Sequence, residues 1–254
     1  MNTFAKVANF CHQKLLQSNE VMEYVLHKRK INLESINKFE IGLFPQDLRE
    51  LFEIINSKEL RLAGIIKNAS VSTFKTQNLV MPIRDVYGNY IAMAGRTLLS
   101  EQEREKHGIV KYINSVYKKS YHLFGFNFAK NSILKKNMVY VVEGYFDVIM
   151  PHQKGLENFV ATCGAFLSIR HVALLSRYTN NIVIIMDNEL EAQEKARKAV
   201  EKNNYEGINL TFYNPLQNDI EKDVDEFLRI HSVEDLSFRL ESKEHYADIR
   251  PLWD

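Results

Sequence analysis

The chain has 254 residues, of which 45% are hydrophobic and 26% charged, a balance typical of a globular protein with a sizeable core. It contains only two cysteines, Cys11 and Cys163, and no CxxC pair, which excludes a disulfide framework, so we expect a reducing compartment and no zinc. We see neither a secretory signal nor a run of about 18 apolar residues, so we expect a cytoplasmic protein without membrane contact. The formal net charge is +1, so any binding of nucleic acid would need locally clustered positive charge.

The first quarter of the chain has the pattern of short helices. Apolar residues recur at three- and four-residue steps over residues 4–15 and again over 21–25, which predicts two helices. Ser18 suits the helix cap between them. We expect a further short helix that starts near Leu33, then a short extended stretch, and then a helix over residues 47–56.

Residues 79–98 predict a β-hairpin. Two runs of β-branched and apolar residues are joined by Tyr87, Gly88 and Asn89, which are typical of a turn. The next segment, residues 101–120, is polar and rich in lysine, and we expect a loop there.

From Met138 onward, short apolar runs alternate with helix-like stretches. The runs are MVYVVEG, NFVATCG, NIVIIMD and INLTFYN; helices are expected after the first run, from about Ser168, and from Glu191 to about Asn203. Buried strands that alternate with helices predict a parallel α/β sheet. The segment from Ser232 is charged, and we expect it to be helical or partly disordered.

Carboxylates follow two of these strands directly, with Glu143 after the first and Asp187 after the third. Asp147 is four residues beyond Glu143, so it should lie on the first turn of the next helix, at the same edge of the sheet, where parallel sheets bind their ligands. Further acids of this group are Glu189, Asp223 and Asp225. Oxygen-only ligands favour Mg²⁺ or Mn²⁺. The alternative is that each acid is a helix cap or a solvated surface group.

The ordered elements EGYFDVI, ATCGAFLSIRHVALLSR, VIIMDNE and DVDEFL resemble the Toprim domain of bacterial DNA primases. The family pattern is a glutamate-glycine turn after one strand, an Asp-x-Asp after a later strand, and a further Asp-x-Asp-Glu, which Asp223, Asp225 and Glu226 match. Toprim domains also occur in topoisomerases, recombination-repair proteins, nucleases and ribosomal-RNA maturases, so the upstream half of the chain has to decide between these families.

The upstream half resembles the N-terminal lobe of the same primases. VMEYVLHKRKINLESINKFEIGLFP is similar to the primase opening, VMPIRDVYGNYIAMAGRTL to its hairpin, and KYINS to the element after it. The resemblance extends from about Ala5 to Leu228. It implies an α/β protein with a mixed α+β primase lobe at residues 1–136, a Toprim parallel-sheet domain at 137–231 and a C-terminal tail at 232–254.

The resemblance implies a DNA primase, which makes short RNA primers from NTPs on a single-stranded DNA template by two-metal phosphoryl transfer. A replicative helicase and a separate zinc-bearing protein are expected as further partners. The expected catalytic residues are Glu143, Asp147 and Asp187, and the expected metal ligands are Asp187, Glu189, Asp223, Asp225 and Glu143. The expected contacts to nucleic acid and nucleotide are Arg84, Arg96, Lys111, Asn114, Lys118 and Lys119.

The sequence departs from the family pattern at several positions. The stretch FKTQN lacks the arginines usual before the hairpin, which leaves only Lys75 nearby. The loop after KYINS lacks the usual His-Lys-Gly element, for which Lys118 and Lys119 are expected to compensate. Glu189 is longer than the usual aspartate and would reposition a metal. We find no zinc-ribbon or P-loop motif, so we expect a minimal core of the kind that a phage or mobile element encodes.

Two alternatives from other classes stay open. A Toprim nuclease would use the same metals to degrade nucleic acid without consuming NTPs. A non-catalytic replication module would keep the fold but lose Mg²⁺ binding, and Glu189 and the missing arginines would support it.

Overall fold

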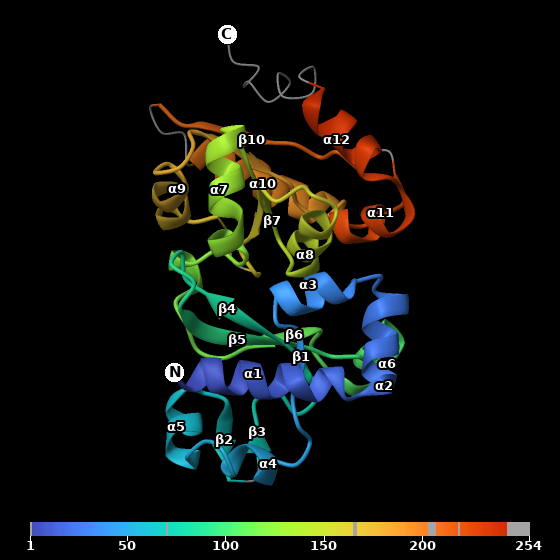
Figure 1. Cartoon of the computed structure of the whole chain (residues 1–254). Helices are drawn as coiled ribbons and strands as arrows, with labels where there is room; N and C mark the ends of the chain where they lie inside the picture. Colours follow the sequence, from blue (N-terminus) through green and yellow to red (C-terminus); the bar gives the residue numbers. More distant parts are fainter. Residues whose placement is uncertain (1, 70, 165–166, 203–206, 218, 243–254) are drawn as a thin grey trace. The chain divides into compact units, whose positions relative to one another are not determined.

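The computed structural model describes residues 2–69, 71–164, 167–202, 207–217 and 219–242 (Figure 1). The chain forms two compact units, Met1–Tyr117 and Lys118–Asp254. This division lies upstream of the expected boundary at residue 136, because helix α7 (Phe126–Lys136) packs on strand β8 (Phe159–Ala161) of the second unit. The functional boundaries at 136 and 231 stay predictions.

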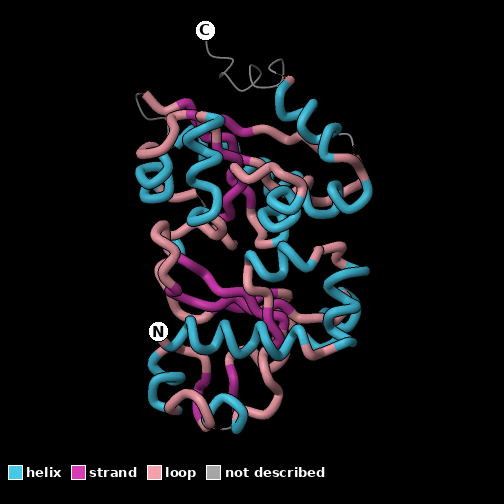
Figure 2. Tube along the Cα trace, in the orientation of Figure 1, coloured by secondary structure: helices cyan, strands magenta, loops and turns pink. Residues whose placement is uncertain are grey.

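Short helices and strands both occur in the first unit (Figure 2). Its helices are α1 (Thr3–Leu16), α2 (Asn19–Glu23) with a π-helical continuation (Tyr24–Lys28), α3 (Leu33–Lys38), α4 (Arg49–Phe52), α5 (Ser57–Leu62) and α6 (Glu101–His107). The first three confirm the helices expected from the apolar periodicity. Ser18 is the N-cap residue of α2, as predicted, although its side chain makes no capping hydrogen bond.

Two predictions for this unit are wrong in detail. The helix expected over residues 47–56 is replaced by the single turn of α4, because Asn56 is extended and its side chain accepts a hydrogen bond from the Lys58 amide, which starts α5 instead. The segment expected to be a loop begins with α6, because Ser100 and Glu103 form a capping box.

The first unit contains an antiparallel sheet in the order β1-β4-β5-β6, and the expected hairpin is its centre. Its strands are β1 (Gly42–Leu43), β4 (Leu79–Arg84), β5 (Tyr90–Arg96) and β6 (Tyr112–Asn114), and β2 (Ile66–Asn68) and β3 (Val71–Ser72) form a separate pair. The Asp85 carboxylate closes the hairpin turn by accepting hydrogen bonds from the amides of Tyr87 and Asn89, both at 2.9 Å. Strand β6 comes from the segment that we expected to be a loop.

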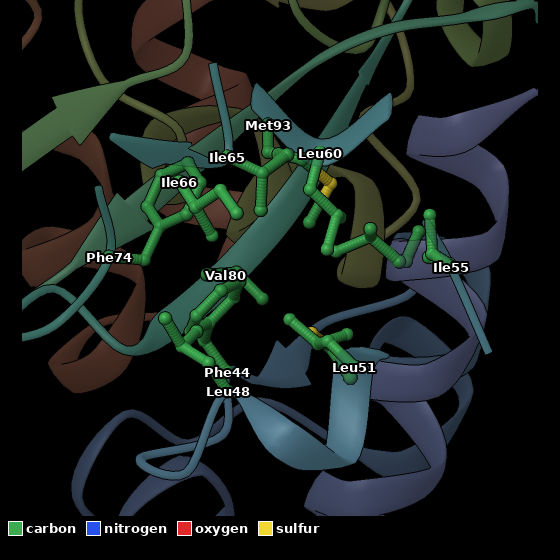
Figure 3. Packing of buried hydrophobic residues seen from close by; sticks show 13 residues of the cluster. Phe44, Leu48, Leu51, Ile55, Leu60, Ile65, Ile66, Phe74, Val80 and Met93 are labelled. Atoms are coloured by element: carbon green, nitrogen blue, oxygen red, sulfur yellow. The ribbon is translucent and has the colours of Figure 1, made fainter. Parts of the chain in front are cut away.

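A hydrophobic cluster joins this sheet to the helices of the first unit (Figure 3). Val80 and Met93 contribute from the hairpin, and the rings of Phe44 and Phe74 lie 5.4 Å apart beside them. Gly95 allows the chain to pass very close by, because a Cβ atom there would lie 2.3 Å from the Gln77 carbonyl oxygen.

The second unit confirms the predicted parallel sheet. Its order is β10-β9-β7-β8, with β7 (Val139–Val142), β8, β9 (Asn181–Ile184) and β10 (Asn209–Phe212) all paired in parallel. Its helices are α7, α8 (Phe146–Gln153), α9 (Ile169–Leu175), α10 (Leu190–Lys202), α11 (Val224–Ile230) and α12 (Val233–Glu241), with a 3₁₀ turn at Lys119–Tyr121. Helix α7 was not predicted.

The chain after Ser232 is helical over α12, as expected, whereas residues 243–254 lie outside the described part. Asn203, the expected end of α10, also lies outside it. A search of the described residues finds no helix with the length and apolar character needed to cross a bilayer.

Replacing Gly95 by alanine should destabilise the first unit by about 1–3 kcal/mol, because the new methyl group would overlap a backbone carbonyl that cannot move aside easily. Urea unfolding monitored by circular dichroism measures the change. The control is Gly108→Asn at the end of α6, where the backbone is left-handed but nothing lies within 4 Å, so the loss should be smaller. Equal losses would contradict the close approach.

Candidate functional site

Three aspartates meet at the carboxyl edge of the parallel sheet. Asp147 lies on the first turn of α8, which follows β7; Asp187 follows β9; and Asp223 precedes α11. One carboxylate oxygen from each lies within 4.8 Å of the others, and we call these three residues the aspartate triad. Asp147 and Asp187 thus lie at the same edge of the sheet, as predicted from the ends of the strands.

Local structure explains why the triad can form. A Cβ atom at Gly144 would lie 2.4 Å from Oδ2 of Asp147, so the glycine leaves room for this carboxylate to fold back over the turn. Asp223 is fixed as the N-cap residue of α11, where its carboxylate accepts a hydrogen bond from the Glu226 amide at 2.8 Å.

The triad concentrates negative charge in a partly buried place. Asp147 is only 6% exposed, and burial, followed by the charges of Asp223, Asp225 and Asp187, raises its pKa well above the usual value. The backbone amide of Asp225 donates a hydrogen bond to Asp147 at 3.0 Å, which holds the carboxylate in place. A set of oxygen donors with excess negative charge fits a hard divalent cation such as Mg²⁺.

Asp225 itself lies outside the triad. Its side chain is 2% exposed and forms an ion pair with Arg229 at 3.3 Å, one turn further along α11. Its carboxylate therefore has a cationic partner of its own, and its backbone supports Asp147.

Glu189 and Glu143 also lie outside the triad. Glu189 forms an ion pair with Lys222, whose ammonium is also 3.9 Å from Asp187. The hydrogen bond with Glu189 and the charges of Asp187 and Asp223 raise the pKa of Lys222. Glu143 is half-buried directly after β7, and its carbonyl accepts a hydrogen bond from the Cys163 amide at 3.0 Å.

The loop before α11 is fixed by Asn188, which the sequence analysis did not single out. Its side-chain amide donates hydrogen bonds to the carbonyls of Leu216 at 2.7 Å and Asp219 at 3.0 Å. Its backbone amide donates to the Lys222 carbonyl at 2.6 Å. Asn188 and Lys222 each stand next to a predicted acid in the sequence, but the pattern gave no sign that they would meet.

In the first unit, Arg84 is engaged by its own neighbours. Its guanidinium forms an ion pair with Glu40 and lies 4.3 Å from the centroid of the Tyr90 ring. The Arg84 side chain is 19% exposed. This geometry favours a role in fixing the hairpin.

Three of the predicted contact residues lie on two paired strands or next to them: Arg96 on β5, Asn114 on β6 and Lys111 directly before β6. Arg96 donates a hydrogen bond to the Tyr24 hydroxyl and lies 5.8 Å from the ring of Tyr112, its cross-strand partner. Lys111 is exposed, and its ammonium is also 5.8 Å from that ring. Asn114 pairs with Ala94 across the sheet.

Lys118 and Lys119 belong to the second unit. Lys118 is exposed, with its ammonium 5.5 Å from the Tyr121 ring. Lys119 donates a hydrogen bond to the Cys163 carbonyl at 3.1 Å.

Each half of the chain matches a known protein family. Residues 10–130 match the family described as DNA primase catalytic core, N-terminal domain, and residues 140–228 match the Toprim-like family. A DNA primase of Synechococcus elongatus is 32% identical over 84% of this chain and 32% of the relative. A DNA primase of Synechocystis is 32% identical over 98% of this chain and 40% of the relative. The chain thus spans about a third to two fifths of the length of these curated relatives.

Solved structures of primases have the same fold. A DNA primase domain from Pseudomonas aeruginosa has a TM-score of 0.79 and 26% identity, over 94% of this chain and 77% of that one. A DnaG primase catalytic domain bound to ssDNA has a TM-score of 0.77 and 27% identity, over 94% and 79%. The two matched domains follow each other in the order found in a primase core, and the chain therefore belongs to the family of DNA primase catalytic cores, with an N-terminal primase domain and a Toprim-like domain.

Proposed function

We propose that this chain is the primer-synthesising core of a DNA primase, which joins NTPs into short RNA on a single-stranded DNA template. The observation that carries the proposal is the aspartate triad at the edge of a Toprim-like sheet. The solved primase domain bound to ssDNA, which this chain resembles along most of its length, supports single-stranded DNA as the template.

In this proposal, Asp147, Asp187 and Asp223 hold Mg²⁺ or Mn²⁺. Divalent cations bound there supply positive charge that stabilises the attacking and leaving oxygens of phosphoryl transfer. Asp225 positions Asp147 through its backbone amide, and Glu143 orients or activates the reacting group from the end of β7. Zinc has no part in this proposal, because the only cysteines, Cys11 and Cys163, are both buried as single residues.

The cationic residues bind phosphates in this proposal. Arg96 is already oriented by Tyr24 and Tyr112, so it loses little freedom when it contacts a phosphate. Lys111 and Lys118 are exposed point charges that attract phosphate, and Lys119 is a further cation. Asn114, which is uncharged, contributes a hydrogen-bonding side chain. Arg84 acts indirectly, by fixing the hairpin through Glu40.

The wider setting is also part of the proposal. The partners are the template, NTPs, a replicative helicase and a separate zinc-bearing protein, and the reaction takes place in the cytoplasm. Comparing primer yield with and without each added protein tests the last two partners.

Asp187→Asn should lower primer synthesis by about 100-fold or more, because it removes a triad ligand and with it several kcal/mol of charge stabilisation. The measurement is incorporation of labelled ribonucleotides on single-stranded DNA with Mg²⁺ or Mn²⁺. Glu234→Gln, an exposed change on α12, is the control and should leave the rate unchanged. Full synthesis by Asp187→Asn would reject the proposal, and metal-dependent degradation of DNA without NTP use would favour a Toprim nuclease.

Asp147→Asn should raise the melting temperature of the metal-free protein at neutral pH. The folded state raises the pKa of Asp147 above its ordinary value of 3.8, so ionisation at higher pH favours the unfolded chain and stability falls as pH rises above that value. The asparagine cannot ionise, so the variant avoids this loss of stability. Its higher melting temperature relative to the unmodified protein should disappear below about pH 4, where Asp147 is protonated in both states.

Thermal unfolding in EDTA, and again with Mg²⁺, measures this effect at both pH values. Mg²⁺ should raise the melting temperature of the unmodified protein more than that of Asp147→Asn, since the variant lacks a ligand. The Glu234→Gln control should follow the unmodified protein. Identical melting curves for the protein and Asp147→Asn would contradict the charge repulsion.

Lys111→Ala should weaken binding of single-stranded DNA and reduce the slope of log affinity against log salt by about 0.7, the value for one lost phosphate contact. Fluorescence anisotropy over a salt series measures both quantities. Lys67→Ala, another exposed lysine of the first unit on β2, is the control with the same charge change. Equal effects of the two substitutions would show that Lys111 has no specific contact.

A further inference from the structure

Lys222 brings a positive charge to the site that is proposed to hold divalent cations. Its ammonium forms an ion pair with Glu189 and lies 3.9 Å from Oδ2 of Asp187, a member of the aspartate triad. The Lys222 side chain is 45% exposed, so a ligand at the triad can reach it from solvent.

The backbone of Lys222 is fixed on both sides. Its amide donates a hydrogen bond to the Glu226 carboxylate at 3.1 Å, and its carbonyl accepts one from the Asn188 amide at 2.6 Å. The same Asn188 holds the preceding loop through its side chain. The ammonium therefore starts from a defined position between the end of β9 and the start of α11.

This charge acts in opposite directions on the two ligands of a polymerase site. A monovalent cation beside Asp187 repels a divalent cation and partly neutralises the ligand that would attract it. The same cation attracts a triphosphate, which carries several negative charges. Glu189 is long enough to reach Lys222, so its carboxylate forms an ion pair with this ammonium.

We propose that Lys222 couples metal binding to triphosphate binding: with no nucleotide it serves as the counter-charge of Asp187 and Glu189, and with nucleotide bound its ammonium contacts the phosphates. Glu189 is then the residue that positions Lys222, and it is not a metal ligand. The inference rests on the proposed function. Coupling of this kind is reciprocal, so metal also strengthens nucleotide binding.

The test measures binding and needs no turnover. Mn²⁺ affinity is measured by calorimetry, without and with a non-hydrolysable NTP analogue, for the unmodified protein and for Lys222→Met. Without the analogue, Lys222→Met should raise Mn²⁺ affinity about threefold. With Mn²⁺ present, it should lower the affinity for the analogue about tenfold. The factor by which each ligand strengthens binding of the other should therefore fall. Lys135→Met is the matched control, an exposed lysine on α7 ahead of β7, and it should change neither affinity.

A second substitution tests the role of Glu189. In the Lys222→Met background, Glu189→Gln should change Mn²⁺ affinity by less than about threefold, because the glutamate has lost its cationic partner and is not a ligand. A loss of about tenfold or more would show that Glu189 acts on the metal directly or through one of its ligands, not through Lys222, and would overturn this part of the proposal.

Two results would overturn the coupling itself. If Lys222→Met resembles Lys135→Met in both affinities, Lys222 has no effect on either ligand. If both affinities fall together, Lys222 only supports the local fold, and circular dichroism would show the accompanying change. Failure of the primase function is a separate result, because it appears as no RNA synthesis by the unmodified protein and leaves these binding measurements unaffected.

Discussion

The carboxylates of Asp147, Asp187 and Asp223 repel one another, and the second unit is built to hold them together despite that repulsion. Parallel strands bring their carboxyl ends to one edge, which places residues from distant parts of the chain side by side. Gly144 and Asn188 then fix the turns that carry the acids. The folded protein therefore holds unfavourable charge, which a divalent cation at the triad would relieve.

In the first unit, two arginines differ in the kind of side chain that contacts them. Arg84 is neutralised by Glu40, whereas Arg96 is oriented by hydroxyl and ring contacts with Tyr24 and Tyr112. These contacts set the position of the Arg96 guanidinium, on which its proposed contact with phosphate depends. The net charge of +1 gives no sign of this arrangement, because acidic and basic residues are interspersed along the sequence.

The sequence predicted the features that depend on local periodicity. The hairpin, the four parallel strands and the edge that carries the triad follow from apolar runs and the residues that end them. The capped helix α6 was missed because a polar helix has no apolar stripe, although Ser100 and Glu103 do spell a capping box. The pairing of Glu189 with Lys222 and of Asp225 with Arg229 was missed as well, because charge partners are chosen by side-chain reach in the folded chain.

The π-helical turn at Tyr24–Lys28 has a consequence for how the chain tolerates changes in length. Such a turn holds one residue more than an α-helical turn, so a deletion there can be absorbed by returning to ordinary helical hydrogen bonds. A deletion inside α1 has no such reserve, since it would rotate the apolar stripe of Val7, Cys11 and Leu15 away from the core. The helical segment whose Tyr24 supports Arg96 can therefore lose one residue and stay helical, whereas α1 cannot do so without turning its buried face.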